Sequence, residues 1–419
     1  MIPRSAFLAS AALLLFTTFV AAEVHMSTPA KTPSTGAVTR LARSSHTFGF
    51  DLYRHLRRKP GNLVISPASI TTALAMTWGG ARGETAAQMG KVLHLEGTAD
   101  EVMSTSGELS RSLQDPTRPV VFRIANRLFA EKSYKLLPAF VEKTREAFGA
   151  PVEPLDFRHA PDPARVHINQ WVEEKTEKRI QDLIPPGGVV PDTRLVLVNA
   201  IYFLGDWADP FEHEATRPAP FHLTASQQKA VPTMNHTGEF RVAQRDGVTA
   251  LEIPYKGGQM SMLLLIPDQI EGLAAVESAL DAKKLEALAG ELKEEHVWLA
   301  LPKFELNPGA SLELGEDLKA LGMPLAFDLQ RADFTGIANP PNPADRLVIG
   351  EVFHKGFVRV DEKGTEAAAA TAVMMFRAGA APMQKPREVK ADRPFLFLIR
   401  DNASGMILFL GRVSDPGAR

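Results

Sequence analysis

The ten residues Leu195–Leu204, which read LVLVNAIYFL, decide the fold class of this chain. Within Arg194–Leu204 they form a nearly continuous apolar run, which is typical of a β-strand buried on both faces. The segments before this run have helical periodicity, and most of the segments after it have strand character. Because helices and strands occupy separate parts of the chain and do not alternate, we predict an α+β fold.

Apolar residues recur at helical spacing in the first part of the chain. The second helix begins at Ser66-Pro67, since a serine cap followed by proline suits the first turn of a helix. The predicted helices are Val38–Lys59, Ser66–Gly79, Glu84–Leu93, Asp100–Leu113, Leu137–Phe148 and Asp162–Lys178.

Strand patterns dominate after residue 194. Lys256-Gly257-Gly258 is a turn signal that joins two predicted strands into a hairpin. The predicted strands are Arg194–Leu204, Ala250–Pro254, Met260–Ile266, Val297–Leu301, Leu347–Val360, Phe395–Arg400 and Met406–Val413, with two short helices near Leu273–Leu292 and Leu312–Leu321. No internal repeat or polar linker divides residues 38–419, so we expect one large domain there.

The N-terminus has the pattern of a secretory signal peptide. Arg4 precedes the apolar run Ala6–Val20, and small residues follow at Ala21 and Ala22. A run of about 15 apolar residues is short for crossing a bilayer. We therefore predict a signal peptide at 1–22, a flexible leader at 23–37 and a secreted or periplasmic protein with no membrane attachment after cleavage.

Composition excludes several classes of function. The 47 Lys and Arg against 49 Asp and Glu leave a charge of −2, so no strong field attracts nucleic acid or an anionic membrane. The absence of cysteine excludes disulfides, thiol nucleophiles and cysteine-bound zinc. The chain also lacks the G-x-S-x-G, H-E-x-x-H and G-x-x-x-x-G-K-[ST] motifs. We expect no enzyme activity, no catalytic residue, no cofactor and no metal site.

The segment Asp361–Phe376, which reads DEKGTEAAAATAVMMF, allows two interpretations. Its alanines favour a surface helix, for which Thr365 would be the cap. Gly364 and the small residues that follow it instead favour a flexible loop, and the composition of residues 378–382 is also that of a loop.

This segment resembles the reactive-centre loop of a serpin, and five further blocks resemble the same family in the same order. These blocks are Asn62–Ile70 (NLVISPASI), Asn199–Trp207 (NAIYFLGDW), Val231–Met234 (VPTM), Leu301–Phe304 (LPKF) and Asp392–Phe395 (DRPF). The resemblance covers about residues 38–415. It implies a serpin fold with three β-sheets, eight to nine helices and an exposed reactive-centre loop.

The resemblance also implies suicide inhibition of a serine protease. The protease cleaves the loop and forms an acyl-enzyme, and the cut loop then inserts into the central sheet and traps the protease in a covalent 1:1 complex. We expect the inhibitor to be a monomer. Small side chains suit insertion, and alternate residues from Thr365 onward would face one side of the sheet. The implied hinge consists of Gly364, Thr365, Glu366, Ala367, Ala368, Ala369 and Ala370.

Two further groups of residues match serpin positions. The shutter residues, which lie beneath the strands that part, are Ser66, Ser69, Asn199 and His354; the breach residues, where the loop enters, are Trp207, Thr216, Lys303 and Glu362. Ordinary packing or capping is the alternative explanation for each of them. For Ser66 the helix cap suffices, whereas His354 is a lone histidine in an otherwise apolar strand.

The scissile bond follows from the family's usual spacing of sixteen residues after the glutamate at the base of the loop. This spacing gives Ala378–Gly379, which suits an elastase-like or subtilisin-like protease. A register one residue shorter gives Arg377–Ala378, which suits a trypsin-like protease. A non-inhibitory serpin that acts as a binding or carrier protein is the alternative function, although the alanines of the hinge favour inhibition.

Overall fold

The computed structural model describes residues 35–149, 152–342, 345–365 and 385–418. All described residues belong to one compact unit, Pro33–Arg419. The predicted signal peptide therefore lies outside the described residues. So does most of the predicted leader, whose last residues, 35–37, belong to the first helix.

Nine α-helices occur in the described ranges. They are α1 Thr35–Leu56, α2 Pro67–Trp78, α3 Gly83–Val92, α4 Ala99–Leu113, α5 Pro138–Phe148, α6 Pro161–Lys175, α7 Leu273–Ala279, α8 Ala282–Gly290 and α9 Gly315–Leu321, with short 3-10 helices η1 His213–Ala215 and η2 Pro324–Phe327. Among these helices, none is both long enough and apolar enough to cross a membrane.

Three predicted helices differ from the observed ones. The predicted helix Leu273–Leu292 is two helices, because Asp281 is extended and its side chain caps α8 by accepting from the backbone N–H of Lys284. The predicted helix Leu312–Leu321 begins with the short strand β11 before α9. The helix α6 ends at Lys175 because Glu177 and Lys178 have positive φ angles of 51° and 61°.

A seven-stranded sheet contains the predicted central strand. Its strands are β10 Phe304–Leu306, β12 Ile349–Val360, β13 Gly364–Thr365, β4 Leu195–Asp206, β2 Val120–Glu131 and β3 Glu153–Leu155 in this order, with β11 Leu312–Glu313 paired to β12. The strands β12 and β4 run parallel, whereas β2 runs antiparallel to β4. The strand β2 escaped prediction because Arg123, Asn126 and Arg127 interrupt its apolar pattern.

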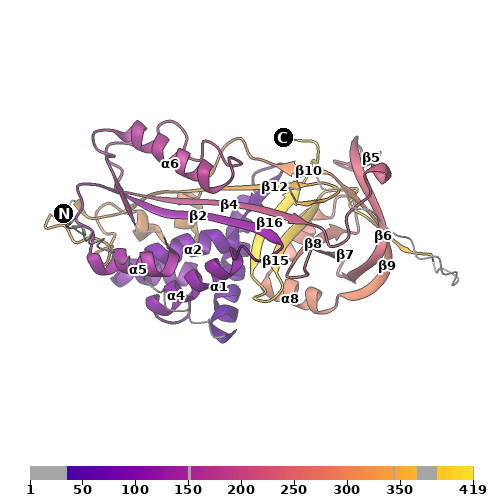
Figure 1. The fold of residues 1–419 in the computed structure, drawn as a ribbon, viewed down its shortest axis with the longest axis horizontal. Helices are drawn as coiled ribbons and strands as arrows, with labels where there is room; N and C mark the ends of the chain where they lie inside the picture. The colour runs from indigo at the N-terminus through magenta and orange to yellow at the C-terminus, as the bar shows by residue number, and fades with distance from the viewer. Residues whose placement is uncertain (1–34, 150–151, 343–344, 366–384, 419) are drawn as a thin grey trace, which may run out of the picture. The chain divides into compact units, whose positions relative to one another are not determined.

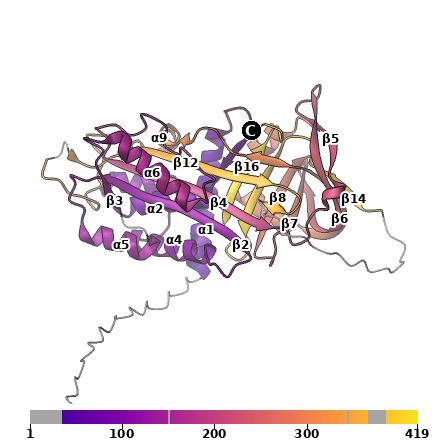
Figure 2. The same ribbon diagram turned by 45° about the horizontal axis from the view of Figure 1, so that its top comes forward.

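The prediction that Leu195–Leu204 is buried on both faces is confirmed, since only Leu204 of these residues is even partly exposed. On one face, Val196 and Val198 pack against Ile168 and Val172 of α6. The other face points toward α2 and the second sheet. Figures 1 and 2 show α6 on one side of β4 and β12 and the remaining N-terminal helices on the other.

The second sheet has nine strands. They are β1 Leu63–Ile65, β16 Ile407–Val413, β15 Phe395–Asp401, β8 Met260–Pro267, β7 Val248–Pro254, β6 Gln228–Arg245, β9 Lys293–Pro302 and β14 Arg387–Lys390 in this order, with β5 Arg217–His222 paired to β6. The long strand β6 pairs with β5 at its start, with β9 along its middle from Thr233 to Val242, and with β7 at its end. Because β6 connects these strands, all nine form one continuous sheet. The described strands therefore form two sheets, where three were expected.

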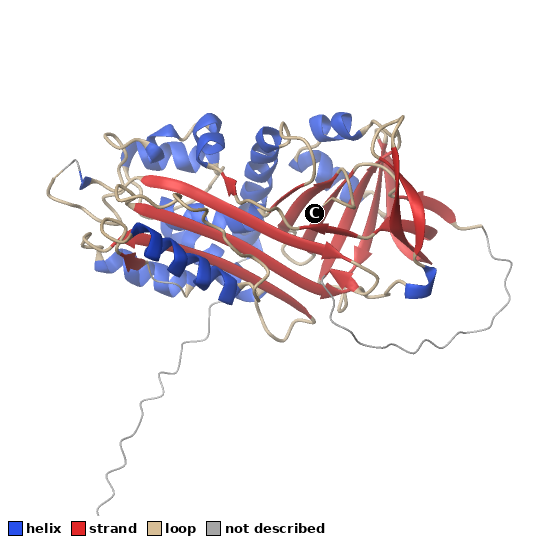
Figure 3. Ribbon diagram, turned by 90° about the horizontal axis from the view of Figure 1, so that it is seen from above, coloured by secondary structure: helices blue, strands red, loops and turns tan. Residues whose placement is uncertain are grey.

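The seven-stranded sheet is divided at one end. From Ile349 to Phe357, β12 pairs directly with β4, but beyond this point β13 lies between them. Figure 3 shows the long strands side by side beneath α6. The residues that match the shutter lie near the middle of β4 and β12, and those that match the breach lie around the end of β4.

Candidate functional site

The shutter residues form one buried hydrogen-bonded network beneath the middle of β4. Asn199 is the only polar residue among Leu195–Leu204 apart from Tyr202, and its side chain faces α2. Its Nδ2 donates to Ser69 Oγ and to Asn126 Oδ1, each at 2.7 Å. Ser69 Oγ in turn donates to Asn126 Oδ1 at 3.1 Å, and Asn126 Nδ2 donates to the carbonyl oxygen of Ser69 at 3.0 Å.

His354 joins β12 to the same network. Its Nε2 accepts from the backbone N–H of Ser66 at 3.1 Å, so the proton of the neutral ring lies on Nδ1 and is donated to Asn199 Oδ1. Complete burial lowers the pKa of His354 from 6.5 to about 3. The imidazole is therefore neutral at physiological pH, and it connects the two strands that loop insertion would separate.

Ser66 has the capping role that its sequence suggests. Its Oγ accepts from the backbone N–H of Ser69 at 3.1 Å, while its own backbone N–H donates to His354. We call Ser66, Ser69, Asn126, Asn199 and His354 the shutter network. Sequence analysis missed Asn126, because its strand β2 was not predicted and none of the quoted serpin-like blocks includes it.

The breach residues meet at the end of β4, around Glu362. The Nζ of Lys303 is 2.7 Å from Glu362 Oε2, and Thr216 Oγ1 donates to Oε1 at 2.8 Å. His213 Nδ1 lies 3.3 Å from Oε1. Burial alone would raise the pKa of Glu362, but the hydrogen bonds from Lys303 and Thr216 outweigh it and lower the pKa to about 2. The carboxylate is thus ionised and held at the base of the loop.

Trp207 fixes the backbone on either side of Glu362. Its Nε1 donates to the carbonyl oxygen of Asp361 at 3.0 Å, and its backbone N–H donates to that of Lys363 at 2.8 Å. The indole stacks on Tyr255 with ring centroids 4.7 Å apart. We call Trp207, Thr216, Tyr255, Lys303 and Glu362 the breach network; sequence analysis missed Tyr255 because no local pattern distinguishes it.

The first two hinge residues already lie in the sheet as β13. Gly364 pairs with Asp206, and Thr365 pairs with Gly205 on one side and with Val360 on the other. A Cβ atom on Gly364 would meet the carbonyl oxygen of Gly205 at 2.0 Å, so close approach requires the glycine. Thr365 is fully buried, and its Oγ1 is 2.7 Å from the hydroxyl of Tyr255.

The other loop residues fall outside the described part of the chain. They are Glu366, Ala367, Ala368, Ala369 and Ala370 of the hinge, and Arg377, Ala378 and Gly379 at the two candidate scissile bonds. Within the described ranges, no group of three His, Asp or Glu side chains is placed to hold a metal ion.

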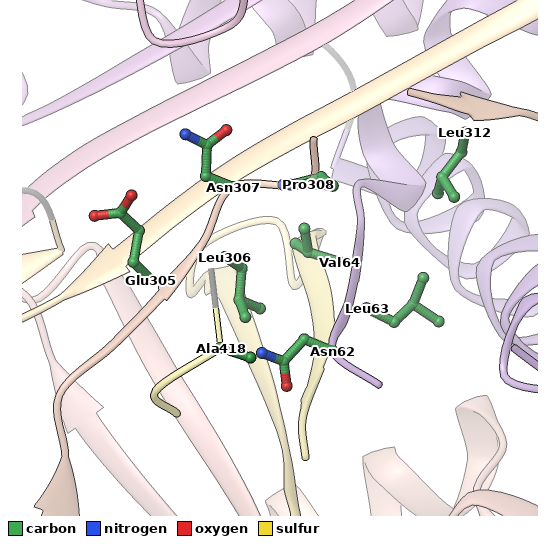
Figure 4. Close-up of a pocket in the computed structure, with 9 residues that line it drawn as sticks. All are labelled: Asn62, Leu63, Val64, Glu305, Leu306, Asn307, Pro308, Leu312 and Ala418. Carbon is green, nitrogen blue, oxygen red and sulfur yellow. The ribbon is translucent and has the colours of Figure 1, made fainter. Parts of the chain in front are cut away.

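A separate pocket lies away from both networks. It has a volume of about 220 Å³ and lies between β1 and the segment that follows β10, as Figure 4 shows. Leu63, Val64, Leu306 and Leu312 supply its apolar side chains. None of the predicted site residues lines this pocket, so it has no part in the candidate site.

Comparison with known proteins gives one consistent family. The family model described as Serpin (serine protease inhibitor) matches residues 43–416. The leukocyte elastase inhibitor of Homo sapiens is 40% identical over 387 residues, which cover 90% of this chain and 100% of that protein. The crystal structure of Serpin48 from Tenebrio molitor is 33% identical with a TM-score of 0.77, over 91% of this chain and 97% of that one. Human thyroxine-binding globulin, solved in complex with thyroxine, is 28% identical with a TM-score of 0.82, over 91% of this chain and 100% of that one.

The comparisons contradict the predicted secreted or periplasmic localisation. The leukocyte elastase inhibitors align over 100% of their own length with 90% of this chain, and the family match begins at residue 43. These relatives therefore contain no counterpart of a leader at residues 1–22. The prediction of export rested on Arg4, the apolar run Ala6–Val20 and the small residues Ala21 and Ala22, and these comparisons show that it is wrong.

Proposed function

Since this chain belongs to the serpin family, we propose that it is a suicide inhibitor of serine proteases. The target protease would cleave the reactive-centre loop and form an acyl-enzyme, and the cut loop would then insert between β12 and β4. The family is described as one of serine protease inhibitors, and the leukocyte elastase inhibitors bear that activity in their name.

The observation that carries the proposal is the position of β13. Because β12 and β4 are parallel, a strand between them can run antiparallel to both, and Gly364 and Thr365 have this orientation. Extension of β13 along β4 would replace the direct pairing of β12 with β4 by two antiparallel ladders. The shutter network joins β12 to β4 on this path, so insertion has to break its contact between His354 and Asn199.

The scissile bond and the class of target remain part of the proposal. We place the bond at Ala378–Gly379, with Arg377–Ala378 as the alternative register. A small apolar residue before the cleaved bond suits elastase-like and subtilisin-like proteases, and the name of the human relative supports this choice. The alternative register would direct the inhibitor to trypsin-like proteases, whose pocket carries a carboxylate.

The test is to incubate the purified protein with pancreatic elastase, subtilisin and trypsin in separate reactions and to examine the products on a denaturing gel. We expect a covalent complex with elastase or subtilisin, and none when the active-site serine of the protease is blocked beforehand. Mass spectrometry of the released C-terminal peptide identifies the register, because it begins at Gly379 or at Ala378. Cleavage of the loop by all three enzymes without any complex would contradict the proposal.

A non-inhibitory carrier is the second candidate, and the similarity to thyroxine-binding globulin favours it. The same gel separates the two functions, since a carrier would be cut without trapping the protease. Thermal unfolding gives an independent readout. Cleavage near Ala378 should raise the transition temperature of an inhibitor, because insertion completes the sheet, and should leave that of a carrier without insertion unchanged.

A further inference from the structure

Trp298 stands apart from the other three tryptophans of the chain. Trp207 lies in an apolar core, and Trp78 and Trp171 pack against such cores. Trp298 on β9 belongs to none of these cores and is partly exposed. An indole that remains in contact with water gains little from folding, whereas tryptophan is enriched at protein–protein interfaces.

A lysine holds the indole of Trp298 in place. The Nζ of Lys390 lies 5.3 Å from the centroid of the ring. The same ammonium is 3.0 Å from Glu388 Oε2, and Glu388 is the register partner of Trp298 on β14. Because this cation–π contact already orders the ring, a partner that binds the ring loses less conformational entropy.

The indole N–H of Trp298 is available to a partner. Within the described ranges it forms no hydrogen bond, and it is not shielded from solvent. The N–H can therefore donate to a carbonyl oxygen on another protein, while the ring supplies apolar surface.

Two ion pairs border Trp298. The first is that of Lys390 with Glu388, and in the second His296 Nδ1 lies 2.9 Å from Glu239 Oε1. His296 is two positions from Trp298 on β9, so their side chains point to the same face of the sheet. Glu239 is the register partner of His296 on β6. We call these five residues the Trp298 face, and its apolar centre with a polar border is the usual arrangement of an interface.

The Trp298 face lies next to the strand that follows the reactive-centre loop. This strand, β14, begins at Arg387, eight positions after Gly379 of the proposed scissile bond, and eight residues span at most about 28 Å. Ala378 is thirteen positions from Thr365 on β13, so a protease at this bond is held more closely to β14. Figure 2 shows β14 and β6 at the same end of the second sheet.

A protease on such a short connection can contact the Trp298 face. A protein of about 230 residues has a diameter of about 45 Å, which exceeds the span of the connection. The strand β9 pairs directly with β14, at the usual strand spacing of about 4.8 Å. The protease surface around the active site therefore reaches the strand that carries Trp298.

We propose that the Trp298 face docks against the surface of an elastase-like protease whose active site holds the loop, an inference that rests on the proposed inhibition. The ring of Trp298 packs against the protease, and its N–H donates to a carbonyl oxygen there. The charges of the face are paired with each other, so the contact depends on packing more than on long-range attraction. Docking strengthens binding before acylation and has no part in loop insertion.

Inhibition kinetics with pancreatic elastase test the proposal on the full chain. Trp298→Thr removes the indole and introduces a residue that favours strands. We expect the second-order rate constant of inhibition to fall at least fivefold. The limiting rate at saturating inhibitor should stay unchanged, because the lost contact is the same before and during acylation. The ratio of complexed to cleaved inhibitor should also stay unchanged, since it is decided after acylation.

Two controls separate docking from damage to the loop. Leu329→Thr removes a side chain that is 63% exposed and lies outside both sheets, and it should inhibit like the wild type. Subtilisin has the same catalytic triad on an unrelated fold, so Trp298→Thr should inhibit it as fast as the wild type does. A thermal scan checks that each variant is folded. Trp298→Phe, which keeps a ring but lacks the N–H, should inhibit elastase at least twofold more slowly than the wild type.

Three outcomes would overturn the proposal. They are an unchanged rate constant with elastase for Trp298→Thr, an equal slowing with elastase and subtilisin, which would show a disturbed loop, and a wild type that traps subtilisin but not elastase. In each of these cases the wild type still forms a covalent complex, so the proposed inhibition stands. A wild type that traps no protease would instead refute the inhibition, and the docking with it.

Discussion

The shutter network and the breach network stabilise the same pair of strands at two different points. The shutter network lies beneath the middle of β4 and contains only neutral groups, all of them buried. The breach network lies at the end of β4 and holds an ionised glutamate against a lysine that is 32% exposed. The first network holds β12 and β4 together, and the second holds the base of the loop where β13 enters.

The contrast between neutral and charged groups follows from the surroundings of the two networks, one in the interior and one at the edge of the sheet. If the proposed insertion separates β12 from β4, no unpaired charge should remain in the interior, since an unpaired buried ion costs far more than a neutral group. A neutral histidine and an asparagine can exchange partners at lower cost. At the edge of the sheet, solvent reaches Lys303, so an ion pair can anchor Glu362 without full desolvation.

The largest effect should come from a charge at the hinge. Thr365→Arg places an unpaired cation at a fully buried position of β13, so insertion should become slower than deacylation. We expect the ratio of complexed to cleaved inhibitor to fall at least tenfold on a denaturing gel. Thr237→Arg, at an exposed strand position, is the control and should form complex like the wild type. Undiminished complex formation by Thr365→Arg would refute the hinge assignment.

Removal of the central group of the shutter network should have the next largest effect. Asn199→Leu deprives His354 Nδ1, Ser69 and Asn126 of a partner inside the core. We expect the free energy of unfolding in urea to fall by about 3 kcal/mol, because buried polar groups lose their hydrogen bonds. Asn307→Leu, an exposed position, should change it little. An unchanged stability of Asn199→Leu would show that the network contributes nothing to holding the strands.

The two networks should respond to acid in different pH windows. The pKa of His354 is about 3 in the folded chain against 6.5 ordinarily, and that of Glu362 is about 2 against 4.5. In both cases the unfolded chain binds the proton first as the pH falls. The contribution of His354 is therefore complete above pH 6.5 and is lost from there down to about 3, whereas that of Glu362 is lost from 4.5 to about 2.

Urea unfolding from pH 7.5 to 3 checks this separation. His354→Gln should flatten the stability curve from about pH 6.5 downward, where one such group changes stability by up to about 1.4 kcal/mol per pH unit. Glu362→Gln should leave that range unchanged and flatten the curve below about pH 4.5 only. His159→Gln, whose side chain is 74% exposed, is the control and should follow the wild type. Identical curves for all variants would contradict the contrast between the two networks.

The smallest effect concerns the hydrogen bond between Tyr255 of the breach network and Thr365 of β13. Tyr255→Phe removes the partner of Thr365 Oγ1 and keeps the stacking on Trp207. We expect a loss of about 1 kcal/mol in the free energy of unfolding. Tyr134→Phe is the matched control, because its hydroxyl has no partner among the described residues and its removal should cost nothing. Equal stability of both variants would mean that the Thr365 contact does not hold β13 in place.

Sequence reasoning was most successful where one segment carries all the information. The apolar run around Asn199 identified β4, and the serine–proline pair identified the start of α2. It failed where polar residues interrupt a pattern, as in β2, and where a single cap divides a helical stretch, as at Asp281. It was also wrong about localisation, since the leukocyte elastase inhibitors, which align over their whole length with 90% of this chain, contradict the predicted export.

The sequence by itself determined the fold class and the family resemblance, and through that resemblance it singled out Asn199, His354 and Glu362. Only the tertiary structure decided which groups meet them. His354 and Asn199 are 155 positions apart, and Tyr255 and Thr365 are 110 positions apart. Local patterns report on neighbours within a few residues, whereas a buried hydrogen bond is set by the packing of whole strands and helices. Asn126 and Tyr255 therefore became recognisable only once β2, β4 and β13 lay side by side.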